Sequence, residues 1–132
     1  MSNANRFYTQ WLRWLPVILY ASLIFWASSK PTTPIPPIPL PHADKGIHFV
    51  EFAILCYLIC WAQGPPGRNV KKSMLLAILI TSAYGITDEY HQSFTPLRQP
   101  EVGDWVADTF GAVAAGLFWL KPRSRYFRPS GE

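Results

Sequence analysis

Four long apolar runs constrain what this chain can fold into more than any other feature of its sequence. They cover residues 12–27, 47–62, 73–86 and 105–120, and the polar residues are bunched between them. The chain is 49% hydrophobic and 15% charged, and its mean hydropathy of only +0.08 hides this separation of apolar and polar residues. With its polar flanks, each run approaches the roughly 20 residues that a helix needs to cross about 30 Å of hydrocarbon. The pattern predicts an all-α fold, a four-helix transmembrane bundle.

Basic residues gather on one side of this predicted topology. Arg6 and Arg13 precede the first run, three basic residues lie between the second and third runs, and four follow the fourth, so nine of the twelve share one side. Because positively charged loops stay in the cytoplasm, we expect a multi-pass protein of the cell membrane with both termini cytoplasmic. This distribution argues against nucleic acid as a partner, although the net charge is +4.

The length of the chain predicts one integral membrane domain over residues 1–132. Its core covers about residues 8–120, and the basic tail 121–132 is expected near anionic lipid head groups. Residues 30–42 hold six of the thirteen prolines, which predicts an extended strap over the outer face.

A cleaved signal peptide is the alternative interpretation of the first run. Arg6 and Arg13 precede the run, and the small residues "ASS" at 27–29 end it. The apolar run is longer than the usual signal-peptide core of about 7–15 residues, which favours a retained helix.

Polar residues form a stripe on the outer half of each of the last three predicted helices. At about 100° per residue, the stripes are Asp44, His48 and Glu51 in the second helix, Asp88 and Gln92 with Glu89 beside them in the third, and Asp104 and Asp108 in the fourth. The helical rise places Glu51, Asp88 and Asp108 roughly 10, 7 and 6 Å below the outer boundary. An ionised acid that faces lipid costs about 3 kcal/mol or more, so such groups normally face the interior of a bundle. We therefore expect one polar pocket just beneath the outer surface.

Small residues predict where the helices pack closely. Ala107, Gly111 and Ala115 recur at every fourth position of the fourth run, which favours close approach of a neighbouring helix, and Gly85 has a similar place in the third. Cys56 and Cys60 lie four residues apart inside the second run. They are interpreted as small buried apolar residues rather than as a disulfide framework.

Two segments carry a resemblance to a known family. "ADKGIHFVEFAIL" at residues 43–55 and "TDEYHQSFTPLRQPEVGDWVADTFGAVAAG" at residues 87–116 resemble the VanZ-like membrane proteins, named for an accessory protein of glycopeptide resistance that lowers susceptibility to teicoplanin. The matching positions are Asp44, Lys45, His48 and Phe49, then Glu89, Gln92 and Phe94, then Arg98, Asp104, Asp108 and Gly111. The resemblance covers roughly residues 8–120, and Asp108 stands where many members carry asparagine.

The leading functional hypothesis is that the outer pocket binds or processes a polar head group, such as that of a lipid-linked cell-wall intermediate. The tails of this lipid would lie in the bilayer, and membrane lipids are the expected partners. Arg98 would meet a phosphate or carboxylate, and His48 with Glu51 or Glu89 would transfer a proton. The candidate catalytic residues are His48, Glu51, Asp88, Glu89, Gln92, Asp104 and Asp108, and the candidate binding residues are Asp44, Lys45 and Arg98.

Two other hypotheses stay open. The polar groups can form a purely structural network, or the protein can handle protons or a divalent ion held by His48, Glu51, Asp88, Glu89 and Asp108. The sequence assigns no cofactor and no dedicated metal framework, because it has neither a Gly-rich phosphate loop nor a zinc-type Cys/His pattern. It predicts neither a reaction nor an oligomeric state.

Overall fold

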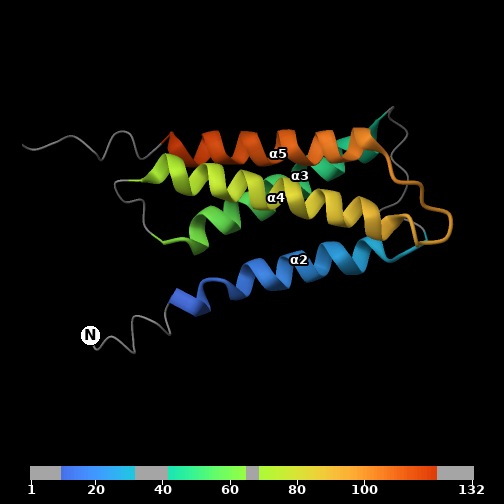
Figure 1. Ribbon diagram of the computed structural model, residues 1–132, viewed down its shortest axis with the longest axis horizontal. Helices are drawn as coiled ribbons and strands as arrows, with labels where there is room; N and C mark the ends of the chain where they lie inside the picture. The colour runs from blue at the N-terminus through green and yellow to red at the C-terminus, as the bar shows by residue number, and fades with distance from the viewer. Residues whose placement is uncertain (1–9, 32–41, 65–68, 122–132) are drawn as a thin grey trace, which may run out of the picture.

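Four helices form the described part of the chain in the computed structural model, which covers residues 10–31, 42–64 and 69–121 (Figure 1). They are α2 (Leu15–Ser28), α3 (Ala43–Ala62), α4 (Val70–Gln92) and α5 (Val102–Leu120). The predicted all-helical fold is confirmed, and the described residues contain no strand. The last three helices begin before their apolar runs because their polar flanks are helical too. Most of the predicted proline strap and of the basic tail lies outside the described residues.

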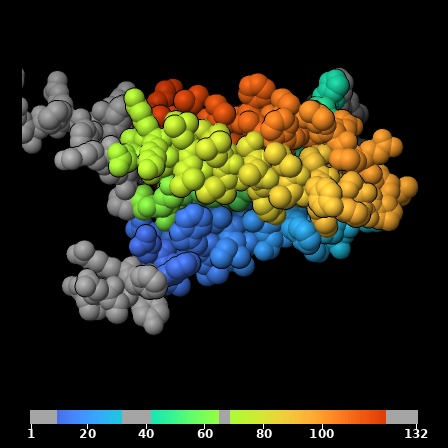
Figure 2. All heavy atoms as spheres, in the orientation of Figure 1, coloured from blue at the N-terminus to red at the C-terminus, as the bar shows by residue number. Residues whose placement is uncertain are grey.

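Consecutive helices run in opposite directions, so the bundle has two distinct ends (Figure 1). The most extensive contact joins α3 and α5; α4 packs on both, and α2 lies against α3 and α4. Figure 2 shows α2 as a separate layer along one side of the molecule. The end of α2 at Ser28, the start of α3, the end of α4 and the start of α5 therefore meet at one end, which we call the acidic end.

Glycines set the closest helix approaches, as their spacing predicts. A Cβ added at Gly111 of α5 would collide with the backbone carbonyl oxygen of Phe49 in α3. One turn and a half further on, a Cβ at Gly116 would lie 2.9 Å from Ile78 of α4. The small side of α5 thus faces both of its neighbours, which allows the backbones to approach closely.

The core between the helices is centred on α3. Phe52, Leu55 and Ile59 are buried there, and both cysteines are buried beside them without a disulfide bond. Cys56 and Cys60 therefore act as the small apolar residues that the sequence predicts.

The outward surfaces of the helices are apolar, as expected of a protein in lipid. Exposed large apolar side chains occur on all four helices, for example Leu19, Leu23, Ile54, Leu79 and Phe110. Three helical segments, Gln10–Ser28, Ala43–Ala62 and Val70–Gln92, are long and apolar enough to cross a membrane. The 19-residue α5 is not among them, because Asp104 and Asp108 lower the hydropathy of its first half.

Candidate functional site at the acidic end

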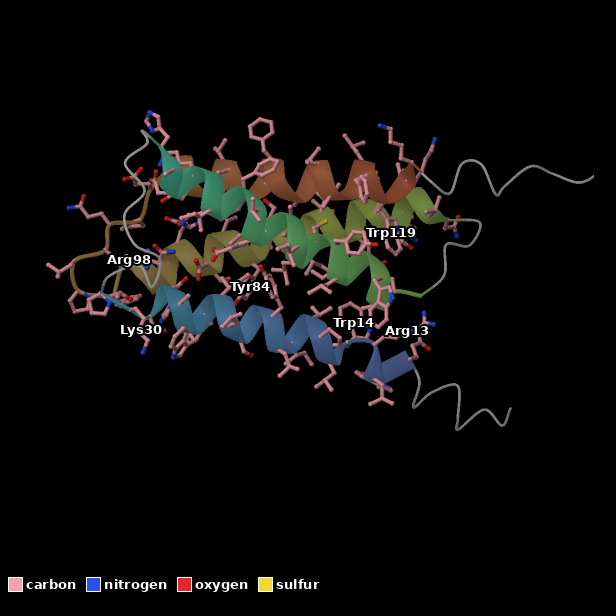
Figure 3. The ribbon with its side chains drawn as sticks, turned by 180° about the vertical axis from the view of Figure 1, so that it is seen from behind. Arg13, Trp14, Lys30, Tyr84, Arg98 and Trp119 are labelled. Carbon is pink, nitrogen blue, oxygen red and sulfur yellow. The ribbon has the colours of Figure 1, made fainter. Side chains whose placement is uncertain are left out.

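A cavity of about 140 Å³ opens at the acidic end. All four helices and the α4–α5 connection contribute to its lining, which consists of Ala27, Ser28, Asp44, Ile47, His48, Glu51, Gln92, Arg98, Gln99 and Asp104. Arg98 and Lys30 lie at this end in Figure 3, whereas Arg13, Trp14 and Trp119 lie at the other. The volume is far above the roughly 10–15 Å³ of probe-occupied space that one water molecule needs. The cavity is therefore large enough for a small polar group.

A histidine–carboxylate pair joins α3 to α5 beneath the cavity. His48 Nδ1 lies 3.0 Å from Asp108 Oδ1, and the Asp108 side chain is fully buried. The other ring nitrogen, Nε2, lies 3.9 Å from Asp104 Oδ2, which is too long for a hydrogen bond. The ring therefore presents Nε2 toward Asp104 and the cavity while Nδ1 is held by Asp108.

Lys45 forms ion pairs with three carboxylates on the outer side of the site. Its Nζ lies 2.8 Å from Glu101 Oε2, 2.9 Å from Asp104 Oδ1 and 3.3 Å from Asp44 Oδ2. Asp104 is the most buried of the three acids, since its side chain is 11% exposed. One lysine thus fastens the start of α3 to the start of α5.

Asp88 ties α2 to α4. Its Oδ2 accepts hydrogen bonds from Ser28 Oγ at 2.9 Å and from Gln92 Nε2 at 2.8 Å, and all three side chains are buried. Thr95 Oγ1 adds a weaker bond to the Ser28 carbonyl oxygen at 3.3 Å. Asp88 itself does not line the cavity. Its contacts indicate a structural role in holding the otherwise peripheral α2.

Glu89 meets the first residues of α5. Its Oε2 accepts the backbone N–H of Glu101 at 2.8 Å, directly before the helix begins. A carboxylate at this place is stabilised by the partial positive charge of a helix N-terminus. The second oxygen, Oε1, is buried and accepts no hydrogen bond within the described part of the chain.

The α4–α5 connection brings a guanidinium to the cavity. Arg98 Nε donates to the carbonyl oxygen of Lys30 at 3.2 Å, next to the end of α2. Leu97 before it has a φ of 66°, in the left-handed region. Because Nε makes the only hydrogen bond of the Arg98 side chain to the described residues, its terminal nitrogens remain for an anion in the cavity.

Glu51, on α3, is the carboxylate of the cavity lining that lies furthest along its helix from the acidic end. It is half-buried, and it lies close enough to His48, Asp88 and Asp108 to interact with them electrostatically. No hydrogen bond joins it to another described side chain. It is therefore the lining acid least committed to holding the bundle together.

Comparison with known proteins places this arrangement in a family. The model of the VanZ/LLP1 family matches residues 2–121, which include all four helices and every residue of the site. The chain belongs to the VanZ/LLP1 family. No curated protein and no solved structure matched it significantly.

The predicted site residues of this VanZ/LLP1 protein separate into two groups. Six of them line the cavity: Asp44, His48, Glu51, Gln92, Arg98 and Asp104. The other four surround that lining without belonging to it: Lys45, Asp88, Glu89 and Asp108. The stripes thus converge on one end, but Glu51, Asp88 and Asp108 do not line one pocket together as the depth estimate predicts. Asp88 and Asp108 instead point to partners on α2 and α3.

Two contributors were not anticipated from the sequence of this VanZ/LLP1 chain. Ser28 lines the cavity and binds Asp88, and Glu101 binds Lys45. The signal for Ser28 is a small hydroxyl residue at the end of an apolar run, which the sequence also allows as a cleavage site. Glu101 lies in a connection, where helical periodicity gives no orientation.

Proposed function

We propose that this VanZ/LLP1 protein binds the phosphorylated head group of a lipid-linked cell-envelope component in the cavity at its acidic end. In this proposal all four helices cross the cell membrane, both termini are cytoplasmic and the acidic end faces outward. The observation that carries the proposal is that Arg98 lines a cavity whose other polar lining groups come from all four helices and from Gln99 in the α4–α5 connection. A guanidinium with unused donors is well suited to two phosphate oxygens.

The acids of the lining complement such a ligand. Glu51 and Asp104 can accept hydrogen bonds from sugar hydroxyls or an amine while Arg98 holds the phosphate. His48 lies among them and can exchange a proton at Nε2. The lining therefore suits a head group that carries both an anion and hydrogen-bond donors.

A neighbouring groove supports a lipid as the carrier of this head group. It has a volume of about 330 Å³ and runs beside the start of α5, between Ile86, Glu89, Pro100, Glu101, Val102 and Trp105. Most of these side chains are apolar, so the groove suits a hydrocarbon chain in the bilayer. Glu89 stands between this groove and the cluster around His48 and Asp104.

Binding of a polyprenyl phosphate to the purified protein in nanodiscs tests the proposal, with the corresponding polyprenol as the matched ligand without phosphate. We expect the phosphate to bind more tightly, and Arg98→Gln to weaken it by about 10- to 100-fold, because a hydrogen bond to a charged group contributes about 1.5–3 kcal/mol. Lys72→Gln, an exposed change at the other end of α4, serves as the control. Equal binding of both lipids, or no effect of Arg98→Gln, contradicts the proposal.

The family resemblance adds a cellular readout. We expect cells that express the protein to show lower susceptibility to teicoplanin, and Arg98→Gln to abolish this difference at equal protein levels. Susceptibility that stays unchanged on expression of the wild-type chain argues against a role in glycopeptide resistance. The nanodisc experiment tests lipid binding independently of this result.

A further inference from the structure

We propose that His48, Glu89 and Asp104 form a binding site for one divalent transition-metal ion, Zn²⁺ or Mn²⁺, beside the cavity. The three residues come from α3, α4 and α5, and each offers a ligand atom within 4.8 Å of the other two. An ion bonded at about 2.0–2.2 Å holds its ligand atoms about 3–4 Å apart. The site therefore needs only a small contraction.

The orientation of His48 is that of a metal ligand. When its Nδ1–H donates to Asp108 at 3.0 Å, Nε2 carries the lone pair and points toward Asp104 Oδ2 at 3.9 Å. Metal-binding histidines commonly donate their second ring N–H to a carboxylate, which fixes the ring and raises its basicity. Asp108 is the carboxylate that accepts this second N–H from His48. It is therefore a positioning residue in the proposed site.

Glu89 supplies a second and independent observation. Glu89 is only 9% exposed, and its Oε1 accepts no hydrogen bond from the described residues. A buried carboxylate oxygen without a partner is costly. Because the other oxygen is held by the Glu101 N–H, a cation between Glu89, His48 and Asp104 would satisfy the unpartnered one.

The charge balance of the acidic end also favours a cation. All seven acidic residues within the described ranges lie there. Lys45 already fills the second possible cluster, formed by Asp44, Glu101 and Asp104, because its ammonium group contacts all three acids. Lys45 contacts the cluster with His48 at Asp104 Oδ1, whereas Asp104 Oδ2, the oxygen that faces His48, has no hydrogen-bond donor among the described residues. This second cluster is therefore the one with room for an ion.

The donor set selects the kind of ion. Imidazole suits Zn²⁺ and other transition metals, and two carboxylates also suit Mn²⁺, whereas Mg²⁺ and Ca²⁺ prefer oxygen ligands alone. Three protein ligands leave at least one coordination position open. His48 and Asp104 line the cavity, so that position would meet a phosphate oxygen there; this role rests on the proposed function, whereas the ion site itself does not.

The experiment is a titration of the purified full chain in detergent with Zn²⁺ or Mn²⁺ after chelator treatment, in the absence of any lipid phosphate. We expect one ion per chain, with Mg²⁺ binding much more weakly. Glu89→Gln and Asp104→Asn should lower the affinity by at least about 100-fold, and Asp108→Asn by about 10- to 100-fold. Glu51→Gln and Asp44→Asn, neighbouring acids outside the site, should change it by less than about threefold.

Several results would overturn the site. These are the absence of stoichiometric ion in the wild-type chain, an equal effect of Glu89→Gln and Glu51→Gln, or preference for Mg²⁺. If the variants do not fold, Co²⁺ bound to the wild-type chain decides. A site of low coordination number with an imidazole ligand absorbs visible light much more strongly than octahedral Co²⁺ bound adventitiously by carboxylates and water, and it shows magnetic coupling to the imidazole nitrogen. A weak spectrum without this coupling overturns the site.

Lipid binding with and without chelator separates this inference from the proposed function. Phosphate-selective lipid binding that a chelator weakens supports both. Binding of one ion per chain without selective lipid binding supports the metal site and overturns the proposed function. Selective lipid binding by a chain that binds no ion supports the proposed function and overturns the metal site.

Discussion

His48 on α3 and Asp108 on α5 lie 3.0 Å apart directly beside the closest approach of their two helices. The next residue after His48 is Phe49, whose carbonyl oxygen faces Gly111, and Gly111 follows Asp108 by less than one turn. The glycine therefore lets the backbones come close enough for the buried pair to form. Packing and polar chemistry are set by the same few residues at this crossing.

Gly111→Ala tests the closeness of this crossing. The added methyl group would collide with backbone rather than with a flexible side chain, so we expect the free energy of unfolding to fall by about 1–3 kcal/mol. Thermal unfolding in detergent, followed by circular dichroism, measures the change. Gly46→Ala on α3 is the matched control, since a Cβ there meets nothing within 4 Å and a helix gains up to about 1 kcal/mol from this exchange. Equal effects of the two variants would show that Gly111 is not at a close contact.

Ser28→Ala tests the attachment of α2. The change removes a buried hydrogen bond to the Asp88 carboxylate, and we expect a loss of about 1–3 kcal/mol in stability. Hydrogen exchange should increase first in α2, because this helix has the smallest contact with the others. Ser29→Ala is the control, since Ser29 Oγ is exposed and binds the Phe25 carbonyl of its own helix. Unchanged exchange in α2 of the Ser28 variant would refute the structural role given to this bond.

Lys45 should be coupled unequally to its acidic partners. The side chain of Glu101 is 56% exposed and that of Asp104 is 11% exposed, although both lie within 2.9 Å of the ammonium group. In double-mutant cycles with Lys45→Met, we expect a coupling energy of about 0–1 kcal/mol for Glu101→Gln and a larger one for Asp104→Asn, because solvent screens the exposed pair more strongly. Chemical unfolding at low and high salt provides the values. A larger coupling to Glu101 than to Asp104 would contradict this assignment.

The helices and their inner faces were predictable because both follow from simple periodicities. Apolar runs give helices of membrane length, and a polar stripe at 100° per residue must face protein rather than lipid. This reasoning brought His48, Asp104 and Asp108 to one end of the bundle correctly. The small-residue stripe likewise predicted the close packing at Gly111.

The pairing of individual polar groups was not predictable from the same patterns. Periodicity gives the face of a helix but not which neighbour that face meets, so it could not show that Asp88 turns to Ser28 on α2 while Asp108 turns to His48. Glu101 precedes α5 in a connection with no regular repeat, and its bond to Lys45 depends on the path of that connection. These partners require the tertiary structure.

The orientation of the bundle and the crossing of α5 are tested by cysteine labelling in intact cells. We expect a membrane-impermeant maleimide to label Leu97→Cys from outside, since Leu97 is 88% exposed at the acidic end, and to label Lys72→Cys only after the membrane is opened. A cysteine added after Glu132 should behave like Lys72→Cys if α5 crosses the membrane. The wild-type chain is the control, because Cys56 and Cys60 are buried and should not react. Labelling of the added C-terminal cysteine from outside would mean that α5 does not cross the membrane. Labelling of Lys72→Cys from outside, instead of Leu97→Cys, would mean that the acidic end faces the cytoplasm.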